Sequence, residues 1–370
     1  MSLYTPFRYD YVGSFLRPEA LKTARADHEA GRITAAELKA VEDAAITELI
    51  DKQKAAGYHV ITDGEFRRAT WHLDFMWGFE GVGHKPTEHG LQFHDEAAKI
   101  DDTFLTGKLS VTTHPFVEHF QFVKQFEDAQ TVAKQTIPAP AQVLEQFIMP
   151  VNRAQTFSIY DSEEALVADI VYCYQQVIRD LYAAGCRNLQ FDDCTWGLFV
   201  DERAHQFFAA DDAELARLQR LFLEINNRAI AGKPDDLVIN THICRGNFHS
   251  TWACSGPYDA IADLVFAQEN VNALYLEFDD ARSGSFECLR QVSPDKKVVL
   301  GLVTTKSPEL EDKQQIISRI REAAQFVPLD RLYLSPQCGF ASCEIGNKLS
   351  EEEQWAKLAL VREIAEEIWG

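Results

Sequence analysis

The sequence lacks any apolar run of about 18 residues, the length that a helix needs to span a bilayer. Residues 1–17 lack the basic region and following apolar region of a secretory signal peptide. Basic residues are scarce, with 36 Lys and Arg against 57 Asp and Glu. The formal net charge of −21 therefore argues against nucleic acid and anionic membranes as partners. Eight cysteines without an export signal are typical of reduced thiols, so we expect a cytoplasmic protein.

No low-complexity tract or long linker interrupts the 370 residues. Hydrophobic residues make up 46% and charged residues 25%, which predicts a fully packed core. Short apolar runs alternate with helical patterns, and some are continuous, such as 298–303, as expected for strands buried on both faces. The strand-like runs are Arg8–Ser14, His59–Asp63, Thr131–Ile137, Asn188–Asp192, Leu237–Thr241, Ala273–Glu277, Lys297–Val303 and Arg331–Ser335.

Helix-like segments separate these runs. Pro18–Ala56 is long and alanine-rich, and Ser162–Ala184 carries apolar residues at helical spacing. Ser307–Pro308 is typical of a helix start, and Ser350 begins a capping-box pattern. Eight βα units in a chain of this length predict one TIM (β/α)8 barrel spanning 1–370.

Two regions exceed the minimal barrel. They lie at about 67–130, which is rich in aromatic residues and histidine, and at Met149–Tyr160. Long loops in compact domains are usually functional, so we expect these excursions to cover the C-terminal face of the barrel.

The ends of three strand-like runs carry one imidazole, one carboxylate and two thiols. These residues are His242, Cys244, Glu277 and Cys338. The set suits tetrahedral zinc, and the C-terminal ends of barrel strands meet at one rim. Zinc with two thiolate ligands is electron-rich, which makes it a poor activator of water and a good carrier of a nucleophilic thiolate.

Each of these residues also has a simpler interpretation. A buried cysteine is usually a small hydrophobic residue, and we interpret Cys173, Cys186 and Cys288 in that way. A carboxylate such as Glu277 at a barrel mouth is often only solvated or paired in a salt bridge. A His-x-Cys pair alone is weak evidence for a metal. Its combination with a carboxylate and a further thiol, all at strand ends, favours a metal site.

Six motifs occur in a specific order and spacing along the chain: Val12–Phe15, Asp63–Phe66, Gln190–Asp193, Thr241–Cys244, Leu276–Glu277 and Pro336–Gly339. In this arrangement the chain resembles, over nearly its whole length, the C-terminal catalytic barrel of cobalamin-independent methionine synthase. The resemblance implies a barrel that methylates homocysteine on sulfur, with Zn2+ held by His242, Cys244, Glu277 and Cys338. It also implies that the amino-acid end of homocysteine is bound by Val12, Gly13, Ser14, Glu65 and Asp192.

The implied binding of homocysteine is chemically consistent. Glu65 and Asp192 can accept charge-assisted hydrogen bonds from the ammonium, while Ser14 and the backbone at Gly13 can donate to the carboxylate. A free thiol with a pKa of about 8.5 is mostly protonated at neutral pH, and metal coordination deprotonates it. Because four protein ligands close the shell, the incoming thiol must add to it or displace a ligand, and Glu277 is a candidate for displacement.

The chain departs from the family on the side of the methyl donor. The N-terminal half of the full synthase, which helps bind the polyglutamate tail of the folate, has no counterpart here. Lys306 stands where the family has an acid histidine, Gln146 where a tryptophan stacks on the pterin, and Leu198 where a glutamate contacts it. A folate nitrogen leaves poorly without a proton, so Lys306 is the candidate catalytic residue. The donor stays open between a methyl-folate without a long tail and a methyl-corrinoid, free or protein-bound, and we expect poor use of a triglutamyl folate.

Three alternatives stay open at this point. One is a zinc-dependent alkyltransferase that acts on a different small thiol. Another is a metal-dependent hydrolase, which is disfavoured because the first strand-like run lacks a His-x-His pair and the ligands are rich in sulfur. The third is a non-catalytic zinc-binding or thiol-binding protein, such as a metabolite sensor.

Overall fold

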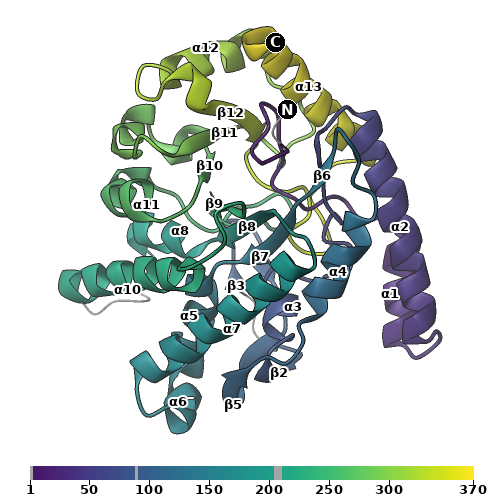
Figure 1. Ribbon diagram of the computed structural model, residues 1–370, viewed down its shortest axis with the longest axis vertical. Coiled ribbons are helices and arrows are strands. Elements are labelled where there is room, and N and C mark those ends of the chain that lie inside the picture. The colour runs from purple at the N-terminus through teal and green to yellow at the C-terminus, as the bar shows by residue number, and fades with distance from the viewer. Residues whose placement is uncertain (1–2, 88–90, 204–210) are drawn as a thin grey trace.

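The computed structural model describes residues 3–87, 91–203 and 211–370. Its centre is a ring of parallel strands with helices packed around the outside (Figure 1). β1 pairs with β6, and β6 continues after Lys134 into β7, which pairs with β8; the order then runs from β8 to β12. These strands are β1 (Val60–Ile61), β6 (Val132–Ala133), β7 (Gln135–Pro138), β8 (Asn188–Asp193), β9 (Val238–Ile243), β10 (Ala273–Glu277), β11 (Lys297–Val303) and β12 (Leu332–Pro336).

The eighth position of the ring is filled by an irregular segment. The predicted strand Arg8–Ser14 is wrong, because this segment forms only an isolated parallel bridge between Tyr9 and Leu334. The Phe15 N–H then donates to Gly64 O at 3.1 Å, so the segment crosses from β12 to the end of β1 and closes the barrel. Beyond the bridge, side chains replace the ladder, since Thr62 Oγ1 donates to the carbonyl oxygen of Gly13 at 2.9 Å. The TIM barrel predicted from the sequence is confirmed by the family and structural comparisons given below.

Helices follow most of the barrel strands along the chain. They are α1 (Glu19–Glu29), α2 (Ala35–Ala55), α3 (Leu73–Met76), α4 (Pro115–Lys124), α5 (Pro140–Ile148), α6 (Pro150–Ile159), α7 (Glu163–Ala183), α8 (Thr195–Val200), α10 (Asp212–Ile230), α11 (Ala262–Gln268), α12 (Lys313–Ala323) and α13 (Glu351–Trp369). Short 3-10 turns lie at η1 (Tyr258–Ala260), η2 (Ala281–Ser283), η3 (Phe286–Gln291) and η4 (Leu329–Arg331).

Two of the predicted helices differ from the structure. Pro18–Ala56 is not one helix, because the chain reverses at Gly31 (φ 68°) and a new capping box at Thr34 starts α2. Ser307–Pro308 does not open a helix either, since α12 begins only after its cap, Asp312. The buried Lys357 of α13 binds Glu309 O and the Glu311 carboxylate, which holds this stretch in a loop. The capping box at Ser350 and the helix over 162–184 are confirmed as α13 and α7.

The excursion at about 67–130 covers the barrel rim only in part, and its residues 88–90 lie outside the described residues. It contains α3, α4 and the strands β2 (Glu80–Lys85), β3 (Leu91–Gln92), β4 (Ala97–Ala98) and β5 (Asp102–Ser110). Near the β3–β4 hairpin, the Phe93 and Phe248 rings are 5.3 Å apart, and Glu96 pairs with His249 at 2.8 Å, so this part lies over the loop after β9. β5 instead runs along α6, where Gln155 Nε2 donates to Leu105 O at 2.6 Å.

Polar side chains fill the inside of the barrel in layers. Alternate residues of β8, namely Asn188, Gln190 and Asp192, are all buried, as the period of two along a strand requires. In the middle layer the Lys134 ammonium pairs with Asp10 at 3.0 Å and donates to Gln190 Oε1 at 3.0 Å. Asp192 belongs to the layer nearest the carboxyl ends of the strands, where the site described below lies.

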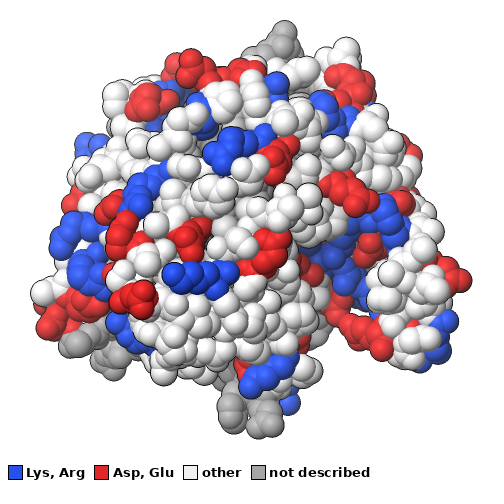
Figure 2. All heavy atoms as spheres, turned by 60° about the horizontal axis from the view of Figure 1, so that its bottom comes forward, with Lys and Arg blue, Asp and Glu red and all other residues white. Residues whose placement is uncertain are grey.

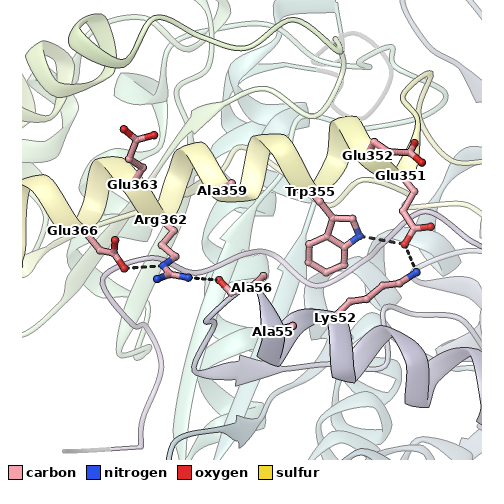
Figure 3. A pocket seen from close by; sticks show the side chains of 10 residues that line it. All are labelled: Lys52, Ala55, Ala56, Glu351, Glu352, Trp355, Ala359, Arg362, Glu363 and Glu366. Carbon is pink, nitrogen blue, oxygen red and sulfur yellow. Dashed lines mark hydrogen bonds and ion pairs between the residues drawn. The ribbon is translucent and has the colours of Figure 1, made fainter.

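The outer surface offers little that competes with this rim as a functional site. Acidic and basic side chains are interspersed over the face drawn in Figure 2. A groove of about 730 Å³ lies between α2 and α13, and Figure 3 shows that its two basic groups pair with acidic ones: Lys52 with Glu351, and Arg362 with Glu366. Among the described residues, no helix combines the length and apolar character needed to cross a membrane.

Candidate metal centre and amino-acid site

The carboxyl ends of β9, β10 and β12 bring His242, Cys244, Glu277 and Cys338 together. Their ligand atoms all lie within 4.8 Å of one another, and the residues are 1%, 5%, 0% and 4% exposed. The strand register brings these residues together, because His242 pairs with Tyr275, two residues before Glu277. Gly301 of β11 lets the chain after β12 come close, since a Cβ at this position would lie 2.6 Å from Gln337 Cα.

The four side chains fit a tetrahedral zinc ion. Two sulfurs bound to one zinc at about 2.3 Å lie about 3.8 Å apart, and Cys244 Sγ and Cys338 Sγ are 3.7 Å apart. Both ring nitrogens of His242 and both carboxylate oxygens of Glu277 are buried without a hydrogen-bond partner. Unpaired buried polar atoms of this kind are costly, so a cation shared by the four groups accounts for their arrangement.

Cys194, which the sequence reasoning did not single out, lies beside this group. Asp193 pairs in register with Ile243, and the Cys244 N–H donates to Asp193 O at 3.0 Å, which places Cys194 next to Cys244. The hydrogen bond with Cys194, together with burial, holds the pKa of Cys244 well above its usual range. These thiols therefore stay protonated unless a cation lies among them. The position of Cys194 directly after the strand-ending Asp192 and Asp193 was the available signal.

Tyr258 and Arg245 hold the two ligand-bearing strands in place. Tyr258 Oη donates to Ile243 O at 3.3 Å and accepts the Glu277 N–H at 3.0 Å, so one phenol bridges β9 and β10. The Arg245 guanidinium lies 3.9 Å from the centre of the Tyr258 ring. It donates to Glu277 O at 3.3 Å and to Ser283 Oγ at 2.9 Å. Tyr258 lies on η1, and no spacing in the sequence connects it to Glu277, whereas Arg245 directly follows the ligand Cys244.

Glu65 and Asp192 lie buried in the same end of the barrel. Thr136 Oγ1 donates to Glu65 Oε1 at 2.9 Å, while Glu65 Oε2 is buried without a partner. Asp192 is the register partner of His242, so this carboxylate is a neighbour of the metal ligands. Burial raises the pKa of Glu65, and burial followed by the charge of Glu65 holds the pKa of Asp192 well above its usual range. The buried Arg68 already pairs with Glu65 Oε1 at 3.2 Å, and the unpartnered Glu65 Oε2 leaves an acceptor for a further cationic group.

The turn that carries Glu65 is strained. Glu65 has a φ of 63°, a left-handed conformation that is uncommon for a residue other than glycine. The Asp63 carboxylate accepts the Glu65 N–H at 2.8 Å, and Arg17 Nη2 donates to Glu65 O at 2.7 Å. Strain that the surroundings enforce in this way is common at functional sites.

The segment Val12–Ser14 lies next to these carboxylates. A Cβ on Gly13 would lie 2.7 Å from Thr136 Cγ2, so only glycine allows the close approach to β7. Ser14 Oγ accepts the Ala341 N–H at 3.3 Å, which anchors it to the loop after Cys338 and leaves its hydroxyl proton free to donate. The five predicted amino-acid-binding residues therefore lie on neighbouring elements at the rim that holds the metal ligands.

Comparisons with known proteins agree with this geometry. Residues 154–367 match the family model described as the catalytic domain of cobalamin-independent synthase. The chain belongs to this family. It is 45% identical over 365 residues to the uncharacterized protein YxjH of Bacillus subtilis, covering 98% of this chain and 95% of that protein. A solved structure from Listeria monocytogenes, assigned to the vitamin-B12 independent methionine synthases, is 36% identical with a TM-score of 0.78 and covers 99% of both chains.

A more distant relative is also similar to the chain over most of both sequences. The methionine synthase of Saccharolobus solfataricus is 23% identical over 342 residues, covering 89% of this chain and 86% of that protein. The resemblance stated from the sequence motifs is therefore confirmed, and membership in the cobalamin-independent synthase family supports a methyltransferase.

The three positions at which the sequence departs from the family belong to different elements of the barrel. Lys306 follows β11, and its Nζ is buried without a hydrogen-bond partner. Gln146, on α5, donates from Nε2 to Thr103 O at 3.0 Å and is held by the excursion, while Leu198 lies on α8. Next to Gln146, burial raises the pKa of Glu145 to about 8, so a neutral carboxylic acid lies on α5 at neutral pH.

Tyr258→Phe should destabilise the protein and make the positions of the metal ligands less fixed. It removes both hydrogen bonds of the phenol and leaves the buried Glu277 N–H without an acceptor, so we expect the free energy of unfolding to fall by about 1–3 kcal/mol. Denaturant titration measures this fall. Tyr182→Phe is the matched control, because the Tyr182 hydroxyl bonds an exposed partner, Asp236. Equal effects of the two substitutions would contradict the bridging role.

Proposed function

We propose that this chain is a zinc-dependent methyltransferase that transfers a methyl group to the thiol of homocysteine and yields methionine. One observation carries the proposal. A set of zinc-type ligands, in which His242 and Glu277 lack hydrogen-bond partners, lies beside a pair of buried carboxylates, because His242 and Asp192 are register partners. A metal centre that can bind sulfur next to an ammonium site matches a thiol-bearing amino acid.

The carboxylate pair supplies recognition of the amino group. Glu65 Oε2 has no partner, and burial raises the pKa of both Glu65 and Asp192. An ammonium placed between them donates charge-assisted hydrogen bonds and offsets their desolvation. The free hydroxyl proton of Ser14 is available to the substrate carboxylate, which orients the substrate with its sulfur toward the ligands.

The ligand residues create a dry environment for sulfur chemistry. They are at most 5% exposed, so a thiol that enters the site loses its contact with water. Zinc, when bound by His242, Cys244, Glu277 and Cys338, supplies a Lewis acid that favours the thiolate form of a coordinated thiol. The bridge made by Tyr258 and Arg245 fixes the backbones of these ligands, so little reorganisation accompanies the reaction.

We propose as the methyl donor either a methyl-folate without a long glutamate tail or a methyl-corrinoid, free or protein-bound. Gln146 and Leu198 cannot stack on a pterin or accept from it as an aromatic ring and a carboxylate would, and Lys306 is the candidate proton donor. We also propose a cytoplasmic location, since all eight cysteines are free thiols.

The metal is the first part of the proposal to test. About one zinc per chain should co-purify, and His242→Ala and Cys338→Ser should each lose most of it in elemental analysis. Cys173→Ser is the control, because Cys173 is a buried thiol of α7 that belongs to no ligand set. Full zinc retention in both ligand variants would contradict the assignment.

Homocysteine should release about one more proton than methionine when each binds, because methionine has the same ammonium and carboxylate but no ionisable thiol. Isothermal titration in buffers of different ionisation enthalpy measures both values. The subtraction removes any protons that Glu65 and Asp192 exchange.

Glu65→Gln or Asp192→Asn should weaken the binding of homocysteine and of methionine and leave the zinc content unchanged. Affinity for mercaptoethanol equal to that for homocysteine, or equal proton release by homocysteine and methionine, would contradict the proposed function.

A further inference from the structure

Three buried side-chain nitrogen atoms in the loops after β10, β11 and β12 have no hydrogen-bond acceptor among the described residues. They are Lys306 Nζ, Arg282 Nη1 and Gln337 Nε2. Arg282 has a side chain only 10% exposed, so it cannot recover the missing bond from bulk water. A buried donor without an acceptor is unfavourable, most of all when it carries charge. A persistent group of such donors at the end of a barrel is suited to a ligand that brings the acceptors.

The three donors belong to loops that follow neighbouring strands. Arg282 lies on η2 after β10, Lys306 follows β11, and Gln337 follows β12. β11 pairs with both β10 and β12. Gln337 also directly precedes Cys338. The donors therefore lie on neighbouring loops at the part of the rim next to the metal ligands.

The orientation of each donor is fixed by its other contacts. Gln337 Oε1 accepts the Thr305 N–H at 2.6 Å and the Thr305 hydroxyl at 3.1 Å, which turns Nε2 away from that loop. Arg282 Nη2 pairs with Asp279 at 3.3 Å and its Nε with Asp280 at 2.6 Å, which leaves Nη1. Fixed donors of this kind need no reorganisation when an acceptor arrives.

Two cations lie at this part of the rim although the whole chain carries −21. Asp279, whose side chain is 2% exposed, pairs with Arg282 Nη2 at 3.3 Å. The Asp280 side chain is 48% exposed, so water screens it. Glu277 is another buried carboxylate whose charge acts on Arg282, and it belongs to the metal-ligand set.

We propose that Lys306, Arg282 and Gln337 form an anion subsite that binds an oxygen of a carboxylate or phosphate group of the methyl donor. The inference rests on the proposed function only for the identity of the ligand as the donor. The subsite assigns to Lys306 the role of binding a negative group of the donor. It selects donors that carry such a group, whether the group is a glutamate carboxylate of a folate or the nucleotide-loop phosphate of a corrinoid.

Binding of inorganic phosphate and of acetate, measured by isothermal titration at constant ionic strength, tests the subsite without any turnover. Wild-type protein should bind one equivalent of at least one of these anions. Lys306→Met and Arg282→Gln should each weaken the binding at least tenfold. The matched controls are Lys39→Met and Arg32→Gln, since both cations lie in exposed ion pairs on α2 and in the turn before it.

The donor comparison then separates the two sources of the anion. Methylcobalamin carries the phosphate that methylcobinamide lacks, and a monoglutamyl methyl-folate carries the carboxylates that the methyl-pteroate lacks. In wild type, one of these pairs should differ at least tenfold in kcat/KM, and Lys306→Met should remove most of that difference. Circular dichroism and zinc content identify any variant that fails to fold, in which case Lys306→Gln takes its place.

Absence of anion binding in the wild type, or equal binding by the wild type and both variants, would overturn the subsite. Homocysteine binding provides the separate readout for the proposed function. If homocysteine still binds and the Lys306 and Arg282 substitutions leave the affinity for anions unchanged, only the subsite is contradicted. If anion binding depends on Lys306 but the protein does not bind homocysteine, only the proposed function is contradicted.

Discussion

The burial of four metal-ligand side chains, two of which have no hydrogen-bond partner, is the constraint on which the rest of the structure depends. His242 and Glu277 place both of their polar atoms in an almost water-free site with no hydrogen bond, next to thiols whose pKa is raised. Such an arrangement is unstable by itself, and surrounding structure must hold it open. The Tyr258 and Arg245 bridge, the approach permitted by Gly301 and the hairpin over the loop after β9 all serve that end.

A parallel barrel solves this problem because every strand ends at the same rim. Register between β8, β9 and β10 places Asp192 beside His242 and brings Glu277 close. Under the proposed function, recognition of an amino acid and binding of its sulfur then occur on adjacent strands. The next strands, β11 and β12, are followed by Lys306 and by Gln337, which directly precedes the ligand Cys338. The residues proposed to bind the two substrates therefore come from different parts of one ring.

Much of this arrangement could be predicted from the sequence. The continuous apolar runs 273–277 and 297–303 became β10 and β11 with unchanged bounds, because a strand buried on both faces has few alternatives. Ligand chemistry at strand ends identified four residues that the structure brings together. Local patterns failed where tertiary contacts decide. Residues 8–14 have a strand-like pattern but cross between two strands, and Lys357, from the last helix, keeps 309–311 out of α12.

Other features depend on spatial relations that spacing does not encode. Cys194 is a neighbour of Cys244 only through the β8–β9 register, and Tyr258 reaches Glu277 from η1, 19 residues earlier. The unpartnered Nη1 of Arg282 depends on how Asp279 and Asp280 hold the other nitrogens of this side chain.

The central claim is that this ligand set holds zinc and that the sulfur of the substrate joins it. X-ray absorption at the zinc edge, with and without homocysteine, measures this directly, since sulfur ligands at about 2.3 Å are distinct from nitrogen and oxygen ligands at about 2.0–2.2 Å. The account predicts two sulfur ligands in the protein alone, from Cys244 and Cys338, and three with homocysteine, but still two with methionine. Two sulfur ligands in all three samples would contradict it.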